Sequence, residues 1–212
     1  MCCRYYMEMS PELRPYIEAA NRSPLKEKMV SKLAKPLVTE GEVRPTDIVP
    51  VIAPSRSSAL TVFPMMWGFA VPKSRTALYN ARVETAAEKP TFKDSWAQRR
   101  CVIPASWYFE WEHFINPATG KSKTGDKYAI QGQGSTLIYM AGLYRMEENA
   151  GIQMPVFTIL TREPAESIRF IHDRMPVLLP KELIRPWVSP DGNPREIASQ
   201  ALTDVVFEKA AV

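Results

Sequence analysis

The 212 residues are enough for one domain with a sizeable core, and 45% hydrophobic with 24% charged residues is typical of a soluble globular protein. No apolar stretch approaches the roughly 18 residues that span a bilayer, and the first residues lack the apolar segment of a secretory signal, so we expect a cytoplasmic protein without membrane contact. Lysine and arginine outnumber acidic residues by only 27 to 23, and three cysteines without a Cys-x-x-Cys or Cys/His cluster argue against disulfides and a zinc site.

Two helices are predicted near the start of the chain. Ser10 and Pro11 combine an N-cap residue with a proline at the first helical position, and an apolar stripe follows them. Ser23 and Pro24 repeat this signal ahead of a second apolar stripe. Each pair therefore predicts the start of a helix.

Short strands dominate the rest of the sequence. Runs of β-branched, aromatic and apolar residues predict strands over Asp47–Ile52, Leu60–Met66, Cys101–Pro104, Trp107–Glu112, Tyr128–Gln131, Leu137–Tyr144, Met154–Thr161, Met175–Leu179 and Asp204–Lys209. Helices are predicted over Glu163–Ile171, Lys181–Trp187 and Asn193–Leu202, and an exposed loop over Asn116–Asp126. This order predicts an α+β fold: a single domain over residues 1–212 whose curled antiparallel sheets form a barrel-like core flanked by several short helices.

Cys2 is the first residue with unusual chemistry. Methionine aminopeptidases remove Met1 when the second side chain is small, and the product then carries an amine and a thiol on neighbouring carbons. The reference pKa of an α-amine is about 7.7–8.0, so a usable fraction is uncharged at neutral pH. Such an amine condenses with an aldehyde, and the thiol closes the imine to a thiazolidine. The ring-opened abasic site is the common DNA lesion that offers an aldehyde.

Four other segments carry polar or aromatic groups in unusual settings. Asn80-Ala81-Arg82 lies in a polar run, and Glu110 lies inside an aromatic strand, where lost solvation raises a carboxyl pKa and suits it to proton transfer. His172 stands between an apolar residue and an acid, and Trp67 opens a segment whose rings could stack on a base.

Each segment also has a purely structural interpretation. Glu110 could pair with an arginine, and His172 could cap the helix that precedes it. Trp67 could be a core residue, and Asn80-Ala81-Arg82 could form a plain turn. For any one segment taken alone, the structural interpretation is favoured.

Together the segments resemble the SOS-response-associated peptidase (SRAP) family, whose members process abasic sites. The resemblance runs over nearly the whole chain and rests on five ordered motifs: Met1-Cys2-x-Arg4, Trp67-Gly68, Asn80-Ala81-Arg82-x-Glu84-Thr85, Trp107-x-Phe109-Glu110-Trp111 and His172-Asp173-Arg174-Met175-Pro176. It implies a DNA-repair protein that captures abasic sites in single-stranded DNA covalently. We expect a monomer that needs neither a metal nor an organic cofactor.

The resemblance also implies a role for each site residue. Cys2 is the nucleophile, Asn80 orients the cysteine or the opened sugar, Glu110 transfers protons, and His172 assists ring opening and reversal. Arg4, Arg82 and Arg174 match positions near the DNA phosphates, whose contacts carry no sequence preference. Trp67 is the expected stacking residue. An imine at the sugar also permits β-elimination, so lyase-like strand incision is expected alongside capture.

Some positions depart from the family pattern, and two other functions stay open. Many members have glycine where this chain has Cys3, and Pro72-Lys73-Ser74 stands where some relatives carry DNA-wedging tryptophans. The first alternative is a cysteine peptidase with Cys2 as nucleophile, His172 as base and Glu110 as orienting acid. The second is a non-covalent binder of single-stranded DNA or modified bases, which would not need Cys2.

Overall fold

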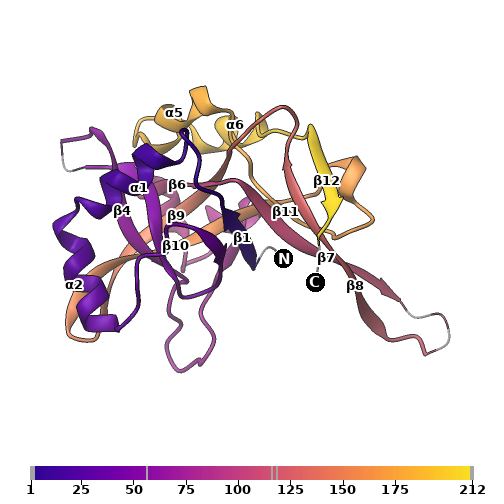
Figure 1. Cartoon of the computed structure of the whole chain (residues 1–212), viewed down its shortest axis with the longest axis horizontal. Coiled ribbons are helices and arrows are strands. Elements are labelled where there is room, and N and C mark those ends of the chain that lie inside the picture. The colour runs from indigo at the N-terminus through magenta and orange to yellow at the C-terminus, as the bar shows by residue number, and fades with distance from the viewer. Residues whose placement is uncertain (1–2, 56, 116, 118, 211–212) are drawn as a thin grey trace.

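The computed structural model describes residues 3–55, 57–115, 117 and 119–210. Two sheets and short helices make up this part of the chain (Figure 1). The first sheet has the strand order β12 (Val205–Lys209), β8 (Ser122–Gly132), β7 (Trp107–Ile115), β1 (Arg4–Met7) and β2 (Gly41–Val43). All its neighbouring strands are antiparallel.

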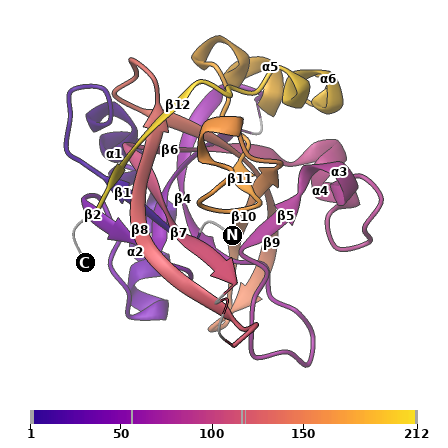
Figure 2. The same cartoon turned by 90° about the vertical axis from the view of Figure 1, so that its right-hand side faces the viewer.

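The second sheet closes on itself. It comprises β3 (Ile48–Pro54), β4 (Leu60–Trp67), β5 (Asn80–Arg82), β6 (Arg100–Ala105), β9 (Ile138–Asn149), β10 (Ile152–Arg162) and β11 (Met175–Pro176). Because β10 pairs with both β4 and β9, the strands β10, β4, β3, β6 and β9 form a ring (Figure 2). The predicted α+β class with a barrel-like core is confirmed, although β10 pairs in parallel with β4 and β5.

Short helices cover the outside of the barrel. They are α1 (Arg14–Asn21), α2 (Pro24–Leu33), α3 (Val83–Ala86), α4 (Lys93–Gln98), α5 (Ile184–Val188) and α6 (Pro194–Ser199), with 3₁₀ turns at Glu166–Ile168 (η1) and Lys181–Leu183 (η2). The helix α1 packs on β3 and β4, and α5 packs on β6. Within the described ranges, no helix combines the length and apolar character needed to cross a membrane.

One hydrophobic core joins the barrel to the five-stranded sheet. Side chains alternate between the faces of a strand, and on β1 this turns Tyr5 and Met7, both fully buried, toward the barrel. On β7 the alternation puts Tyr108 and Glu110 on this same face, and both are buried, as is Phe109 between them. A carboxylate on β7 therefore lies on the buried face of its sheet.

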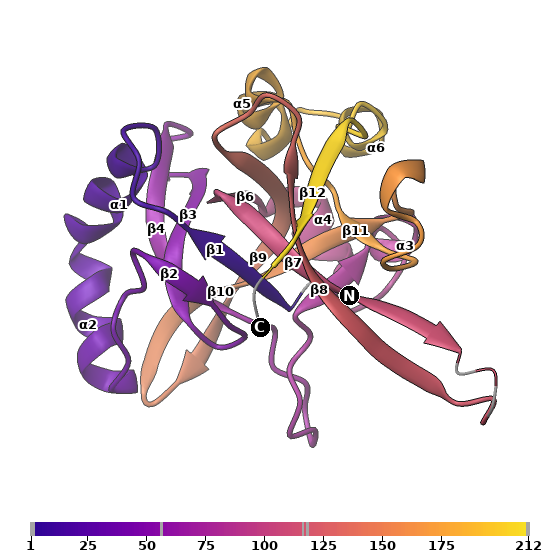
Figure 3. The ribbon, with the colours of Figure 1, turned by 45° about the vertical axis from the view of Figure 1, so that its right-hand side comes forward.

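Most predicted strands are present, with shifted ends, but two predicted segments are wrong. The segment Glu163–Ile171 is not a helix, because it contains only the single 3₁₀ turn η1. Its last carbonyl, at Ile171, accepts a hydrogen bond from the backbone N–H of His113 on β7 (3.1 Å). Asn116–Asp126 was predicted as a loop, whereas β8 begins at Ser122 and extends the hairpin that projects from the body of the molecule (Figure 3).

Two further boundaries are corrected. The residues after Ser10 form a turn, and α1 begins only at Arg14. Ser10 still caps this turn, since its hydroxyl accepts a hydrogen bond from the N–H of Leu13 (3.1 Å). The predicted strand Met175–Leu179 is confined to β11 and an isolated bridge at Leu178.

Candidate active site

The N-terminal strand runs beside the aromatic strand β7. Arg4 pairs with Phe109, so continuing the antiparallel register by one residue sets Cys3 opposite Glu110. Burial raises the pKa of the Cys3 thiol, which is half-buried. The predicted nucleophile Cys2 lies outside the described residues.

Glu110 is a buried acid at this position. Glu110 is only 3% exposed to solvent. Burial raises the pKa of its carboxyl group, against the opposing effect of a hydrogen bond from the Trp111 N–H to Oε1 (3.4 Å). The rise follows from the cost of placing a charge away from water, and it brings the group closer to neutral pH, where a proton-transfer catalyst is most useful.

Two histidines lie next to this acid. The register between β7 and β8 shifts between Trp111 and His113. The rings of His113 and His172 meet edge to face, with centroids 5.1 Å apart and planes at 84°. One ligand atom from each of Glu110, His113 and His172 lies within 4.8 Å of the other two. The predicted proximity of Glu110 and His172 is therefore present.

His172 is held in place through Nδ1. The Arg174 N–H donates to this nitrogen (3.0 Å), and a carboxylate oxygen of Asp173 lies 2.8 Å from it. Burial lowers the pKa of His172 to about 4, and the nearby His113 and Arg174 also lower it, although Asp173 acts in the opposite direction. The ring is neutral at pH 7, and with Nδ1 accepting from Arg174 its proton is on Nε2.

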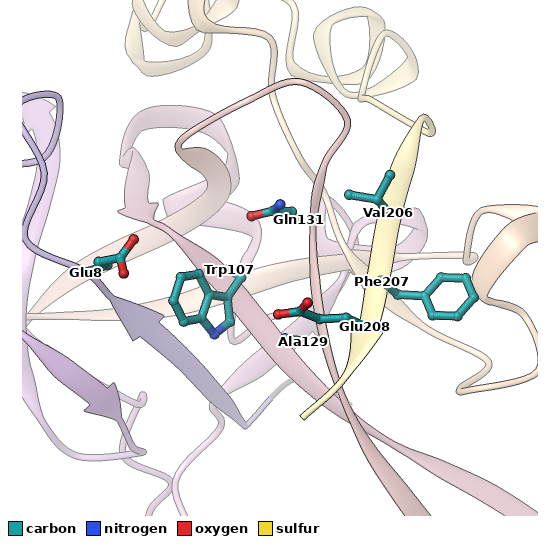
Figure 4. A pocket seen from close by; sticks show the side chains of 7 residues that line it. All are labelled: Glu8, Trp107, Ala129, Gln131, Val206, Phe207 and Glu208. Carbon is teal, nitrogen blue, oxygen red and sulfur yellow. The ribbon is translucent and has the colours of Figure 1, made fainter. Parts of the chain in front are cut away.

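An open cavity of about 320 Å³ gives access to this group. Its lining residues are Cys3, Arg4, Glu110, Trp111, His113 and Thr124. A larger cavity of about 540 Å³ lies over β7, β8 and β12 and contains the side chains of Glu8, Trp107 and Glu208 (Figure 4). Two carboxylates beside this second cavity disfavour a polyanion, so the smaller cavity is the better candidate for phosphate-bearing ligands.

Trp67 is a packing residue, and the prediction that it stacks on a base is wrong for this structure. Trp67 is 0% exposed, and its ring stacks on that of Phe157. The Trp67 ring also packs against the Tyr5 ring of β1, with the ring centroids 5.3 Å apart. Its Nε1–H donates to the Tyr79 carbonyl (2.9 Å), directly before Asn80. Trp67 therefore joins the N-terminal strand to the segment that carries Asn80.

Gly68, the residue after Trp67, packs closely against Tyr79 in the same region. Its φ of +124° is a conformation that other residues rarely adopt, and an added Cβ would lie 2.9 Å from the Tyr79 ring. Asn80 itself is half-buried at the start of β5, opposite Ile159 of β10. The expected convergence of Asn80 with the buried acid and the histidines stays a prediction.

Arg174 is engaged inside the protein. Its guanidinium donates to both carboxylate oxygens of Glu84 (2.9 and 2.7 Å) and to the Thr161 carbonyl (2.7 Å), and its side chain is 9% exposed. Although partial burial acts to raise the pKa of Glu84, the bonds from Arg174 hold it below the ordinary value. This geometry contradicts the predicted phosphate contact and assigns Arg174 to joining the Asn80 and His172 segments.

The other two predicted cations are more accessible. Arg82 is exposed at the end of β5. Arg4 is part of a basic cluster in which the cationic groups of Arg4, Arg44 and Lys127 lie 3.1, 3.1 and 3.0 Å from Glu42. Lys127 also lies over the Phe109 ring, 3.8 Å from its centroid. The single negative charge of Glu42 is shared by three cationic side chains, which leaves a net positive charge beside the cavity.

Comparison with known proteins supports the family that the motifs indicated. The sequence profile of the SOS response associated peptidase (SRAP) family matches residues 1–211. The chain belongs to this family. Among SRAP relatives, the abasic site processing protein YoaM of Bacillus subtilis is 35% identical over 132 residues, which cover 59% of this chain and 56% of that protein. The abasic site processing protein YedK of Escherichia coli is 31% identical over 158 residues, covering 71% and 65%.

The matched segments thus span little more than half the length of the Bacillus relative and about two thirds of the Escherichia coli one. A crystal structure of a protein from Bacteroides thetaiotaomicron superimposes on 99% of this chain and 92% of that protein, with a TM-score of 0.74 and 22% identity. This likeness supports the fold alone.

In this SRAP family member, His113 is the site residue that the sequence analysis missed. Glu110 and His113 are three residues apart, and in a regular strand such residues project to opposite faces. The His113 ring nevertheless reaches the Glu110 carboxylate at the point where the register between β7 and β8 shifts, with the extra residue on β8. A bulge has no reliable signature in a single sequence, but the presence of only two histidines in the chain was a signal worth following.

Proposed function

We propose that the mature protein captures ring-opened abasic sites in single-stranded DNA through the amine and thiol of Cys2. The uncharged amine attacks the C1′ aldehyde and water leaves, giving an imine. The thiol then adds to the imine carbon and its proton passes to the nitrogen, which closes a thiazolidine. The single observation that carries the proposal is the buried acid Glu110 beside neutral His172, at a cavity lined by the residue next to Cys2.

Glu110 and His172 have complementary properties for this reaction. The raised pKa of Glu110 allows the carboxyl group to take a proton from the attacking amine and return it to the departing oxygen. Neutral His172 offers an Nε2–H donor to the ring oxygen of the sugar, which assists opening. Asn80 would orient the opened sugar or the cysteine through its amide.

Arg4 and Arg82 would hold the DNA backbone. Both side chains are partly or largely exposed, unlike that of Arg174. Arginine–phosphate contacts supply affinity without reading the base sequence, which suits a protein that must act wherever a base is missing. The imine also permits β-elimination, so slow lyase-like incision would accompany capture.

The experiment is denaturing gel electrophoresis of mature protein mixed with abasic single-stranded DNA. We expect a denaturant-resistant adduct with abasic DNA and little with intact DNA. Cys2→Ser should abolish the thiazolidine, whereas the neighbouring Cys3→Ser should retain it, which makes Cys3→Ser the matched control. A protein blocked at its N-terminus should also fail, because an amide nitrogen cannot condense with the aldehyde. Equal adduct from the blocked protein would refute the mechanism.

The same samples separate the two alternative functions. A cysteine peptidase would need His172 to accept the thiol proton and remain as a cation, but a pKa of about 4 disfavours the imidazolium form. A non-covalent DNA binder would bind equally well as Cys2→Ser and form no adduct as wild type. Capture predicts an adduct that depends on Cys2.

A further inference from the structure

Glu42 brings together cations from separate segments on the outer face of the five-stranded sheet. Tyr5 on β1 is fully buried toward the barrel, so Arg4, the residue before it, points to the outer face. Glu42 Oε1 lies 3.1 Å from the Nε atoms of both Arg4 and Arg44. Its Oε2 accepts a hydrogen bond from Lys127 Nζ (3.0 Å). Both carboxylate oxygens are therefore engaged with cations.

Lys127 holds this carboxylate in place. Its ammonium group lies 3.8 Å from the centroid of the Phe109 ring and 5.5 Å from that of Trp111, and its side chain is only 15% exposed. Although burial acts to raise the pKa of Glu42, the hydrogen bonds from Lys127 and Arg44 hold it below its ordinary value. Glu42 is therefore an anion at neutral pH, fixed by a cation that rests on the aromatic strand β7.

Arg44 is the member of this basic cluster with donors to spare. Among the described residues, its guanidinium has one hydrogen-bond partner, Glu42, which engages Nε (3.1 Å), and the side chain is 65% exposed. Its backbone N–H donates to the Asp47 carboxylate (2.8 Å), which fixes the main chain as well. A guanidinium anchored through Nε presents its two terminal nitrogens as a fork, and this geometry matches two oxygens of a phosphate.

The basic cluster lies beside the candidate active site. Arg4 lines the cavity of about 320 Å³ together with Cys3 and Glu110. Cys2, the proposed nucleophile, is two residues before Arg4 in the sequence, so the chain between them spans at most about 7 Å. A DNA strand whose abasic sugar reacts with Cys2 therefore passes close to the cluster. Three positive charges against one negative charge favour an anionic ligand there.

We infer that Arg44, together with Arg4, binds one phosphate of the DNA backbone next to the abasic sugar, and that Glu42 is the positioning residue of this subsite. The inference rests on the proposed function, since the abasic strand is the ligand that brings the phosphate here. A carboxylate on a DNA-binding surface repels phosphate, so its presence among three cations is explained by its orienting them. Lys127 acts by holding Glu42 and does not itself contact the DNA.

The test locates the phosphate with uncharged linkages. Single-stranded DNA with a non-reactive abasic analogue is prepared with one methylphosphonate, which has nearly the shape of the phosphate but no charge, at each position around the analogue in turn. Fluorescence anisotropy measures the binding of each strand to the mature wild-type protein. Removing the charge of one linkage next to the analogue should weaken binding about fivefold, the upper end for an exposed ion pair.

Two variants should lose this sensitivity. Arg44→Met removes the fork and Glu42→Gln releases it, so both should bind the charged and the uncharged linkage equally well. Glu40→Gln is the matched control, because Glu40 is exposed two residues before Glu42 and, among the described residues, forms no ion pair. It should keep the fivefold difference. Glu42→Gln and Glu40→Gln change the net charge equally, so a contrast between them cannot come from net charge, and circular dichroism checks the fold of each variant.

Wild-type protein that binds every methylphosphonate strand equally well would overturn the inference, and so would an Arg44→Met variant that keeps the full sensitivity. Sensitivity retained in Glu42→Gln would refute the positioning role. Adduct formation with reactive abasic DNA is measured separately. If the wild type forms no adduct but shows the expected sensitive linkage, the capture mechanism fails and the phosphate subsite stands. Adduct formation without a sensitive linkage would mean the reverse.

Discussion

Replacing Arg174 should destabilise the protein without changing how its DNA binding depends on salt. Arg174→Met keeps most of the side-chain length but removes all its hydrogen bonds. In the native protein, the guanidinium bonds to Glu84 and to the Thr161 carbonyl. Losing these hydrogen bonds therefore weakens the connection between the segments that carry Asn80 and His172.

The expected cost is about 2 kcal/mol. The hydrogen bond to the buried Thr161 carbonyl contributes about 1–1.5 kcal/mol, because a charged donor serves an acceptor that water cannot reach. The Glu84 side chain is 44% exposed, so solvent screening limits the ion pair to about 0.5–1 kcal/mol. For a chain of this length, about 2 kcal/mol lowers the melting temperature by about 4–8 °C.

Arg82→Met is the matched control, because Arg82 is exposed and lies two residues before Glu84. Chemical denaturation measures stability, and fluorescence anisotropy measures binding to single-stranded DNA that carries a non-reactive abasic analogue, over a range of salt. Arg82→Met should flatten the slope of log K against log salt by about 0.7 and leave stability unchanged. A flattened slope in Arg174→Met with wild-type stability would show that Arg174 contacts phosphate.

Two further changes test the site from other directions. The pKa of His172 falls from 6.5 to about 4 on folding, so the unfolded chain takes up this proton at a higher pH than the folded protein does. The free energy of unfolding should therefore drop by on the order of 2–3 kcal/mol as the pH falls from about 6.5 to 4. Chemical denaturation of wild type and His172→Gln should differ in this pH range, and parallel stability curves would contradict the buried neutral ring. Gly68→Ala should cost about 2–4 kcal/mol, since it strains a positive φ and crowds the Tyr79 ring, and a cost below about 0.5 kcal/mol would contradict that packing.

The sequence predicted the parts of the fold that depend on local pattern. Alternation and β-branched residues placed most strands of the barrel, and the N-cap Ser23 placed the start of α2. The predicted helix at Glu163–Ile171 is reduced to one 3₁₀ turn, and the carbonyl of its last residue, Ile171, accepts a hydrogen bond from the His113 backbone N–H on another element. A partner on another strand is invisible to any local rule.

The motif residues were easier to find in the sequence than their roles were to predict. Glu110 and His172 were expected to act together, and the structure brings them together. Trp67 and Arg174 were expected at the DNA surface, yet both are buried, because a large ring and a long cation can equally serve to hold segments together. Burial separates the two roles, and burial depends on the tertiary fold.

These supporting residues explain how distant motifs can build one site. Trp67 contacts Tyr5 on the N-terminal strand and bonds to the carbonyl before Asn80, so one ring links two motifs. Arg174 then links the Asn80 segment, through Glu84, to the turn that carries His172. The His113 backbone N–H on β7 bonds to the Ile171 carbonyl of that same turn, which places His172 against the strand of Glu110. Loss of any one link should therefore misplace groups that it does not itself touch, because each motif is positioned by its neighbours.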